Sequence, residues 1–438
     1  MNYLLIKNGL VISGNRVFKA DVLIGNQKIL DIQSVLSRPE PETPVIDASG
    51  RFVFPGAIDM SNHHWETQLE EEAIERLMNA EIVSGTTTIF KTMEPNEQTL
   101  LSASFELLIQ SKDRRTDYAL HLSPDLIDHL AEKDIVLCYL KYGIVSYVVS
   151  SIHYESFAEA NFDNLIKVLQ TYKLTLIIDL TIPEPEEGFN RMTQVRYSHD
   201  VSKHIKLLVN ILERLKNVQC PVLFSKLRFK EEVLIFDKYL SKNPNLHAEI
   251  ELPCFLGELS PFEVDELTML GGIKLSGKLN PILPDEFREY MAIENYLAAR
   301  PTLSLMIGNT ANSSVFNRPD EYFGLKNFAS MLYTLNVING NLAITDFVAC
   351  ISTRPAKLMG LFPQKGIMRA GADADIVIWN PDFERNIYCN LPSGSDDHEL
   401  KLQGKAEFVF LGGKMVYDGE TFYQENLKGN YVYRSPVA

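Results

Sequence analysis

The sequence predicts an α/β protein: a (β/α)₈ TIM barrel together with a small β-sandwich domain that both ends of the chain form. Three observations support this fold. Short strand-like runs separated by turns occupy both ends, the middle alternates strand-like runs with helical stretches, and about eight such units suit a closed barrel better than an open sheet. We therefore predict a composite β-sandwich domain at 1–52 and 366–438, and a barrel at 53–365.

The strands at the chain ends are indicated by their turns. Residues 21–24 and 28–32 flank Gly25-Asn26-Gln27, a typical hairpin signal. At the other end, Gly412-Gly413 separates strand-like residues 408–411 from 414–417, and residues 374–379 form a further apolar run. Pro55-Gly56 should end the β domain and direct the first barrel strand.

The elements of the middle follow from apolar runs and helical periodicity. We expect helices near residues 67–80, 201–216 and 285–299. Because strands and helices alternate, the strands should pair in parallel. The expected strands are at 89–90, 118–120, 145–149, 174–180, 221–224, 248–252 and 303–307.

Charge and cysteine usage exclude several classes of partner. The chain has 42 Lys+Arg against 57 Asp+Glu, a formal net charge of −15. This acidic balance argues against nucleic acid or an anionic membrane as the main partner. We see neither a secretory signal nor an apolar run long enough to span a membrane, and the five cysteines lack a CxxC pair. These features predict a cytoplasmic protein with reduced thiols.

Several segments resemble one enzyme family in order along nearly the whole chain. Pro-Gly-Ala-Ile-Asp at 55–59 is similar to the entry to the barrel in the amidohydrolase superfamily, and Asp-Ala-Asp-Ile-Val at 373–377 to the exit from it. Segments at 117–121, 251–254 and 278–281 resemble dihydroorotases and dihydropyrimidinases. The resemblance implies a metal-dependent hydrolase of cyclic amides with a TIM barrel.

The same resemblance implies a metal site at the C-terminal mouth of the barrel, where the metal lowers the pKa of a bound water. It implies two His on strand one, a carboxylated Lys on strand four, a His on each of strands five and six, and an Asp on strand eight. Most of these ligands are missing here. The corresponding residues are Ser61 and His63 on strand one, Val148 on strand four, Lys226 on strand six and Thr310 on strand eight.

Only His63 keeps its ligand identity, and the nine histidines form no HxH or HExxH motif. We therefore assign no metal ligand beyond His63 and expect no cofactor, with zinc as the alternative if the ligands are atypical. Asp179 lies near the missing His of strand five, and an ion pair with Lys226 could fill the volume of the metal. His121 should hydrogen-bond at the barrel rim. The candidate pocket is His63, Asp179, Lys226, Asn280, Asn309 and Thr310.

Three functions remain open, in this order. The first is a non-catalytic dihydroorotase- or dihydropyrimidinase-like protein with a binding, assembly or regulatory role. The second is an enzyme that acts without metal through His63, Lys226 and Asp179. The third is a metal-dependent hydrolase with atypical ligands. Expected partners are a small molecule at the barrel mouth, a protein partner, and further copies of the chain, because the resemblance implies a homo-oligomer.

Overall fold

The structure is a computed structural model of the 438-residue chain. It describes residues 3–60, 71–93, 115–123, 132–150, 154, 159–180, 198–227, 229–251, 262–263, 269–270, 273–274, 278–279, 284–299, 323–340, 342–389 and 398–436.

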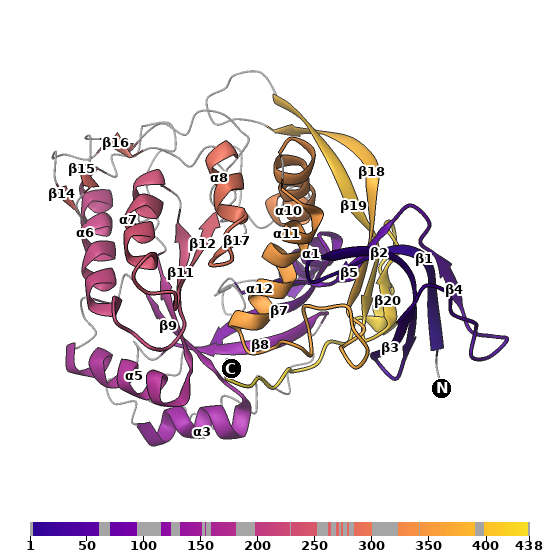
Figure 1. Cartoon of the computed structure of the whole chain (residues 1–438), viewed down its shortest axis with the longest axis horizontal. Coiled ribbons are helices and arrows are strands. Elements are labelled where there is room, and N and C mark those ends of the chain that lie inside the picture. Colours follow the sequence, from indigo (N-terminus) through magenta and orange to yellow (C-terminus); the bar gives the residue numbers. More distant parts are fainter. Residues whose placement is uncertain are drawn as a thin grey trace.

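A curled parallel sheet forms the larger part of the molecule, on the left in Figure 1. Within the described residues it has eight strands, and every neighbouring pair is parallel. Both faces of such a sheet are covered, so its strands are nearly continuous apolar runs. The strands, in order across the sheet, are β6 (Ala57–Asp59), β7 (Thr86–Met93), β8 (Asp117–Leu122), β9 (Ser146–Ser150), β10 (Thr175–Asp179), β11 (Val222–Leu227), β12 (Leu246–Glu251) and β17 (Tyr296–Ala299).

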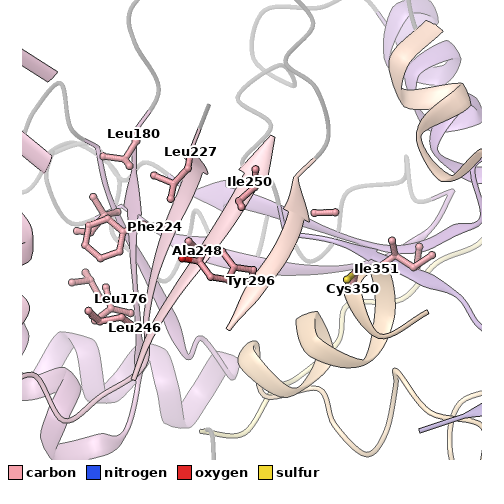
Figure 2. Packing of buried hydrophobic residues seen from close by; sticks show 14 of the residues in the cluster. Leu176, Leu180, Phe224, Leu227, Leu246, Ala248, Ile250, Tyr296, Cys350 and Ile351 are labelled. Atoms are coloured by element: carbon pink, nitrogen blue, oxygen red, sulfur yellow. The ribbon is translucent and has the colours of Figure 1, made fainter. Parts of the chain in front are cut away.

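Most of the described helices lie on the outside of this sheet and follow its strands in the chain (Figure 1). The outward side chains of the strands pack against them in one apolar core, part of which Figure 2 shows. The helices are α1 (Glu71–Val83), α3 (Glu132–Tyr142), α5 (Glu159–Tyr172), α6 (Ser198–Leu215), α7 (Lys230–Leu240), α8 (Pro284–Met291), α10 (Phe323–Tyr333), α11 (Ile344–Val348) and α12 (Arg354–Leu358). The TIM-barrel fold class predicted from the sequence is confirmed.

A second, mixed sheet combines strands from both ends of the chain and is called the end sheet. It lies on the right in Figure 1. The predicted hairpin at its edge is present as β2 and β3, and β5 pairs with β18 across the chain ends. The boundaries predicted for the two domains stay a prediction. The strands of the sheet are β1 (Tyr3–Ser13), β2 (Arg16–Gly25), β3 (Lys28–Gln33), β4 (Val45–Asp47), β5 (Phe52–Pro55), β18 (Ile376–Cys389), β19 (His398–Leu411) and β20 (Lys414–Tyr417).

Gly56 is the single residue between the end sheet and the first barrel strand, as the Pro-Gly pair predicts. Its N–H donates to the Asp375 carbonyl at 2.9 Å. A Cβ at this position would lie 2.1 Å from Oγ1 of Thr87, so only glycine fits so close to the second barrel strand.

One predicted helix is wrong in its second half. We expected a helix over 285–299, but α8 ends at Met291 and strand β17 begins at Tyr296. The sequence Tyr-Leu-Ala-Ala favours a helix by intrinsic propensity, yet it pairs in parallel with β12, and the side chain of Asn295 donates to the carbonyls of Pro244 and Leu246 beside that strand. The strand expected at 303–307 lies outside the described residues.

A buried ion cluster joins the barrel to the end sheet. The Lys365 ammonium lies 2.6 Å from Oδ2 of Asp117, 3.3 Å from Oδ2 of Asp373, and in contact with Asp375. Burial lowers the pKa of Lys365, but the three carboxylates outweigh burial and hold that pKa above its ordinary value. Asp373 and Asp375 therefore hold a cation that the chain itself supplies.

Among the described residues, no helix is long and apolar enough to cross a membrane.

We predict that Lys365→Met lowers the free energy of unfolding by about 3–5 kcal/mol, because it leaves buried carboxylates without their cation. Urea denaturation measures this loss. The matched control is Lys401→Met, which removes an exposed ammonium 2.8 Å from Glu384 and should cost less than about 1 kcal/mol. Equal losses in the two variants would contradict the prediction.

Candidate functional site: the mouth of the barrel

An apolar layer fills the inside of the curled sheet. The cluster that forms it takes a residue from each of seven barrel strands and none from α1, α3, α5, α6 or α7. Its members therefore face away from the outer helices. They are Ile58 and Met60 at β6, then Phe90, Ala119, Val148, Ile177, Leu223 and Leu297, joined by Ala356, Leu358, Met359, Leu361 and Val432.

Val148 belongs to this layer and is only 3% exposed. It sits on β9 opposite Ile177 of β10. The resemblance aligns this position with the carboxylated Lys of the family, but the valine side chain has no donor atom for a metal. The described residues of strand four thus do not fit a bridging carbamate.

Polar residues occupy the next inward-facing positions, two residues beyond the apolar layer toward the C-terminal ends of the strands. Asp179 follows Ile177 with the same orientation and is 6% exposed. Its Cα partner is Ser225 of β11, whose hydroxyl donates to Oδ1 of Asp179 at 3.3 Å. Asp179 therefore lies on the inward face, at the C-terminal end of β10.

Lys226 is located at a β-bulge. Phe224 and Leu227 both belong to the core cluster that includes residues of the outer helices, and Figure 2 labels both, although regular alternation would turn Leu227 inward. The pairing with β12 shifts between these two residues, and Lys226 has a φ of 63°. The bulge thus places Ser225 and Lys226 between two residues of the outer core, on the strand next to the one that carries Asp179. An ion pair between Lys226 and Asp179 stays a prediction.

Glu249 is a candidate residue that the sequence reasoning missed. Leu246, Ala248 and Ile250 of β12 pack in the outer core (Figure 2), so Glu249 faces inward, opposite the inward Leu297. It is 3% exposed. The alternation in Leu-His-Ala-Glu-Ile-Glu at 246–251 was the available signal. The mouth thus carries two carboxylates, Asp179 and Glu249, on the strands either side of Lys226.

His121 is fully buried inside the sheet. Its Nδ1 hydrogen-bonds the Ser146 hydroxyl, its Nε2 lies 3.3 Å from the carbonyl oxygen of Met60, and its ring stacks on Phe90 with centroids 4.6 Å apart. Burial, with the Arg434 charge nearby, lowers the pKa of His121 well below its ordinary value. His121 is therefore a neutral hydrogen-bonding residue of the barrel core.

The remaining predicted site residues lie outside the described part of the chain. They are Ser61, His63, Asn280, Asn309 and Thr310.

The described residues contain one group of three carboxylates close enough to hold a metal ion, Asp117, Asp373 and Asp375. Lys365 already binds all three. At the mouth, Val148 and an ammonium at 226 do not fit the two-metal centre that the family resemblance implies.

Known proteins resemble this chain along its whole length. It is 24% identical to the D-hydantoinase of Ralstonia pickettii over 98% of both chains. The sequence model of the amidohydrolase family matches residues 310–418. The family match and this relative together support the amidohydrolase superfamily, cyclic amidohydrolase group, for this chain.

Other comparisons agree with this amidohydrolase assignment. The dihydropyrimidinase-related protein 5 of Homo sapiens is 24% identical over 96% of this chain and 78% of that protein. The crystal structure of dihydropyrimidinase from Brevibacillus agri has a TM-score of 0.76 at 19% identity, with 100% of this chain and 99% of that one covered. At this identity the structural likeness concerns the fold.

We predict an acid-sensitive contribution from His247, which faces inward on β12 opposite Leu223. Burial lowers its pKa to about 4, partly offset by the Glu294 carboxylate. Between pH 6.5 and that value the unfolded chain binds more protons than the folded one, so stability falls as the pH falls. Relative to His247→Gln, the wild type should lose about 2 kcal/mol between about pH 7.5 and about pH 4.5. Urea denaturation of both proteins across this range measures it, and a difference that does not change with pH would contradict it.

Proposed function

We propose that this amidohydrolase-superfamily chain has a degenerate metal centre, and that its barrel mouth binds a ligand or partner instead of hydrolysing a cyclic amide. The observation that carries the proposal is Val148. It is buried in the apolar layer at the position where the family resemblance implies a metal-bridging lysine. A binding, assembly or regulatory role follows, since the fold alone does not determine the reaction.

The positive charge of Lys226 also supports a degenerate metal centre. An ammonium on β11, between the strands of Asp179 and Glu249, supplies the positive charge that a metal would otherwise bring to these carboxylates. We propose that Lys226 pairs with these groups and keeps the mouth folded without a metal. A protonated lysine cannot coordinate a cation and repels one.

The names of the relatives are consistent with either outcome. They include a D-hydantoinase and a dihydropyrimidinase-related protein, at the same 24% identity. Sequence identity of 24% therefore does not determine whether this chain is a hydrolase, and the residues at the barrel mouth carry the proposal.

An active hydrolase is the second candidate. The observation that favours it is the pair of buried carboxylates, Asp179 and Glu249, at the mouth. Such groups can act as general acids or bases. This enzyme would use His63, Lys226 and Asp179 without a metal, or bind zinc through atypical ligands.

We further propose a homo-oligomer, as the resemblance implies, and a cytoplasmic location. Three cysteines, Cys138, Cys220 and Cys350, are free and buried, which suits a reducing compartment.

The deciding experiment combines metal analysis with activity. We expect the purified protein to contain less than about 0.1 zinc per chain, well below the one or two ions of a functional family site. We also expect no turnover of dihydrouracil, hydantoin or dihydroorotate with added zinc. Stoichiometric zinc with turnover would overturn the degenerate centre, and turnover without zinc would establish the metal-independent alternative.

Removal of the Lys226 ammonium should create a cation site. We predict that Lys226→Met binds Mn²⁺ at least about tenfold more tightly than the wild type, because Asp179 and Glu249 then lack their positive neighbour. Isothermal titration calorimetry measures the affinity. The control is Lys216→Met, which removes an exposed ammonium 3.0 Å from Glu213 on the surface and should leave the affinity unchanged. Equal affinities in all three proteins would refute the role given to Lys226.

A further inference from the structure

The C-terminal segment, residues 428–436, runs along the barrel after the chain has left the end sheet (Figure 1). It adds to β8, because the Asn430 carbonyl accepts the Tyr118 N–H at 3.0 Å and the Val432 N–H donates to the Tyr118 carbonyl at 2.8 Å. Tyr118 is the second residue of β8, so the contact is at the N-terminal end of the barrel, opposite the mouth. Val432 joins the apolar layer inside the sheet.

Two glycines make room for this segment. A Cβ on Gly143 would lie 2.7 Å from the backbone nitrogen of Arg434, and a Cβ on Gly360 would lie 1.8 Å from the Ser435 carbonyl oxygen. Both glycines also have positive φ, 62° and 68°. The segment therefore fits closely and in one position.

Arg434 carries a charge from this segment into the barrel core. It is 4% exposed, and its guanidinium donates to the Ser146 hydroxyl at 2.8 Å, to the Met359 carbonyl at 3.4 Å and to the Leu120 carbonyl. Its Cζ lies 4.9 Å from the centre of the Phe90 ring. Among the described residues no carboxylate pairs with it, and its Nε has no hydrogen-bond acceptor. Burial of a cation without a carboxylate partner costs free energy, and the hydrogen bonds of Arg434 offset part of that cost.

The direction of these hydrogen bonds fixes the tautomer of His121. The Met60 carbonyl can only accept, so Nε2 of the neutral ring carries the proton, and Nδ1 accepts the Ser146 O–H, whose oxygen accepts from the Arg434 guanidinium. Nδ1 is then unprotonated, and the ring proton of the neutral His121 is on Nε2. This N–H is aimed at the Met60 carbonyl, 3.3 Å away.

We propose that the C-terminal segment sets the conformation of the barrel mouth: Arg434 is a positioning residue that acts through Ser146 and His121 on Met60, at the end of the first barrel strand. Met60 directly precedes Ser61 in the sequence, and His63 is three residues after Met60. A partner that displaces residues 428–436, or a protease that removes them, releases Ser146, frees the His121 ring and loosens the entry to the mouth. The inference concerns conformation, so it can fail or succeed independently of the function proposed for the mouth.

The test reads the tautomer of His121 directly. Two-bond ¹⁵N–¹H spectra of ¹⁵N-histidine-labelled protein report which ring nitrogen is protonated, and His121→Gln assigns the signal. We expect the neutral Nε2–H form in the wild type from about pH 8 to about pH 5. In Arg434→Met and Ser146→Ala we expect a mixture of tautomers, whereas Ser146→Thr, which keeps the hydroxyl, should restore the wild-type pattern.

Hydrogen exchange supplies the second readout, at the strand end itself. Peptides covering residues 57–60 should exchange at least about threefold faster in Arg434→Met and Ser146→Ala, while peptides of α7 stay unchanged, because local opening leaves distant elements protected. Arg38→Met, at an exposed arginine in the loop between β3 and β4, is the matched control. If Arg434→Met does not fold, Ser146→Ala alone decides. An Nδ1–H tautomer in the wild type, or an unchanged tautomer and exchange in Ser146→Ala, would overturn the proposal.

Discussion

The Lys365 ammonium and its three carboxylates hold the two sheets in one arrangement. Asp117 begins barrel strand β8, whereas Asp373 and Asp375 lead into β18 of the end sheet. The second oxygen of Asp117 accepts the Asn430 N–H at 2.7 Å, so the same cluster also directs the C-terminal segment. Burial of one cation thus fixes the positions of a barrel strand, the end sheet and the tail, because none of these groups tolerates the loss of its partners.

The sequence predicts the fold well, because the fold depends on features that are local. Alternating apolar runs specify the parallel strands, Gly25-Asn26-Gln27 specifies the terminal hairpin, and Pro55-Gly56 marks the passage into the barrel. The strand at Tyr296–Ala299 could not be predicted in this way. Its residues favour a helix, and only pairing with the neighbouring β12 selects the extended form.

The candidate site is less accessible to sequence reasoning, because a single residue of register decides which side chains face inward. The position of Asp179 could be predicted by alternation, and Glu249 could have been found in the same way. The bulge at Ser225 and Lys226 could not, since no turn residue marks it in the sequence. Arg434 reaches Ser146 from the far end of the chain, a contact that no local pattern contains.

Pairing of β5 with β18 has a consequence for the order in which this protein folds. Phe54 and Val377 are partners in the sheet, yet almost the entire barrel is synthesised between them. During translation the first strands therefore expose an open sheet edge that only the last part of the chain can cover. Contacts of such long separation in sequence slow folding and prolong exposure to aggregation. The newly made N-terminal strands are thus the part of this chain that most needs a chaperone until the C-terminal strands emerge from the ribosome.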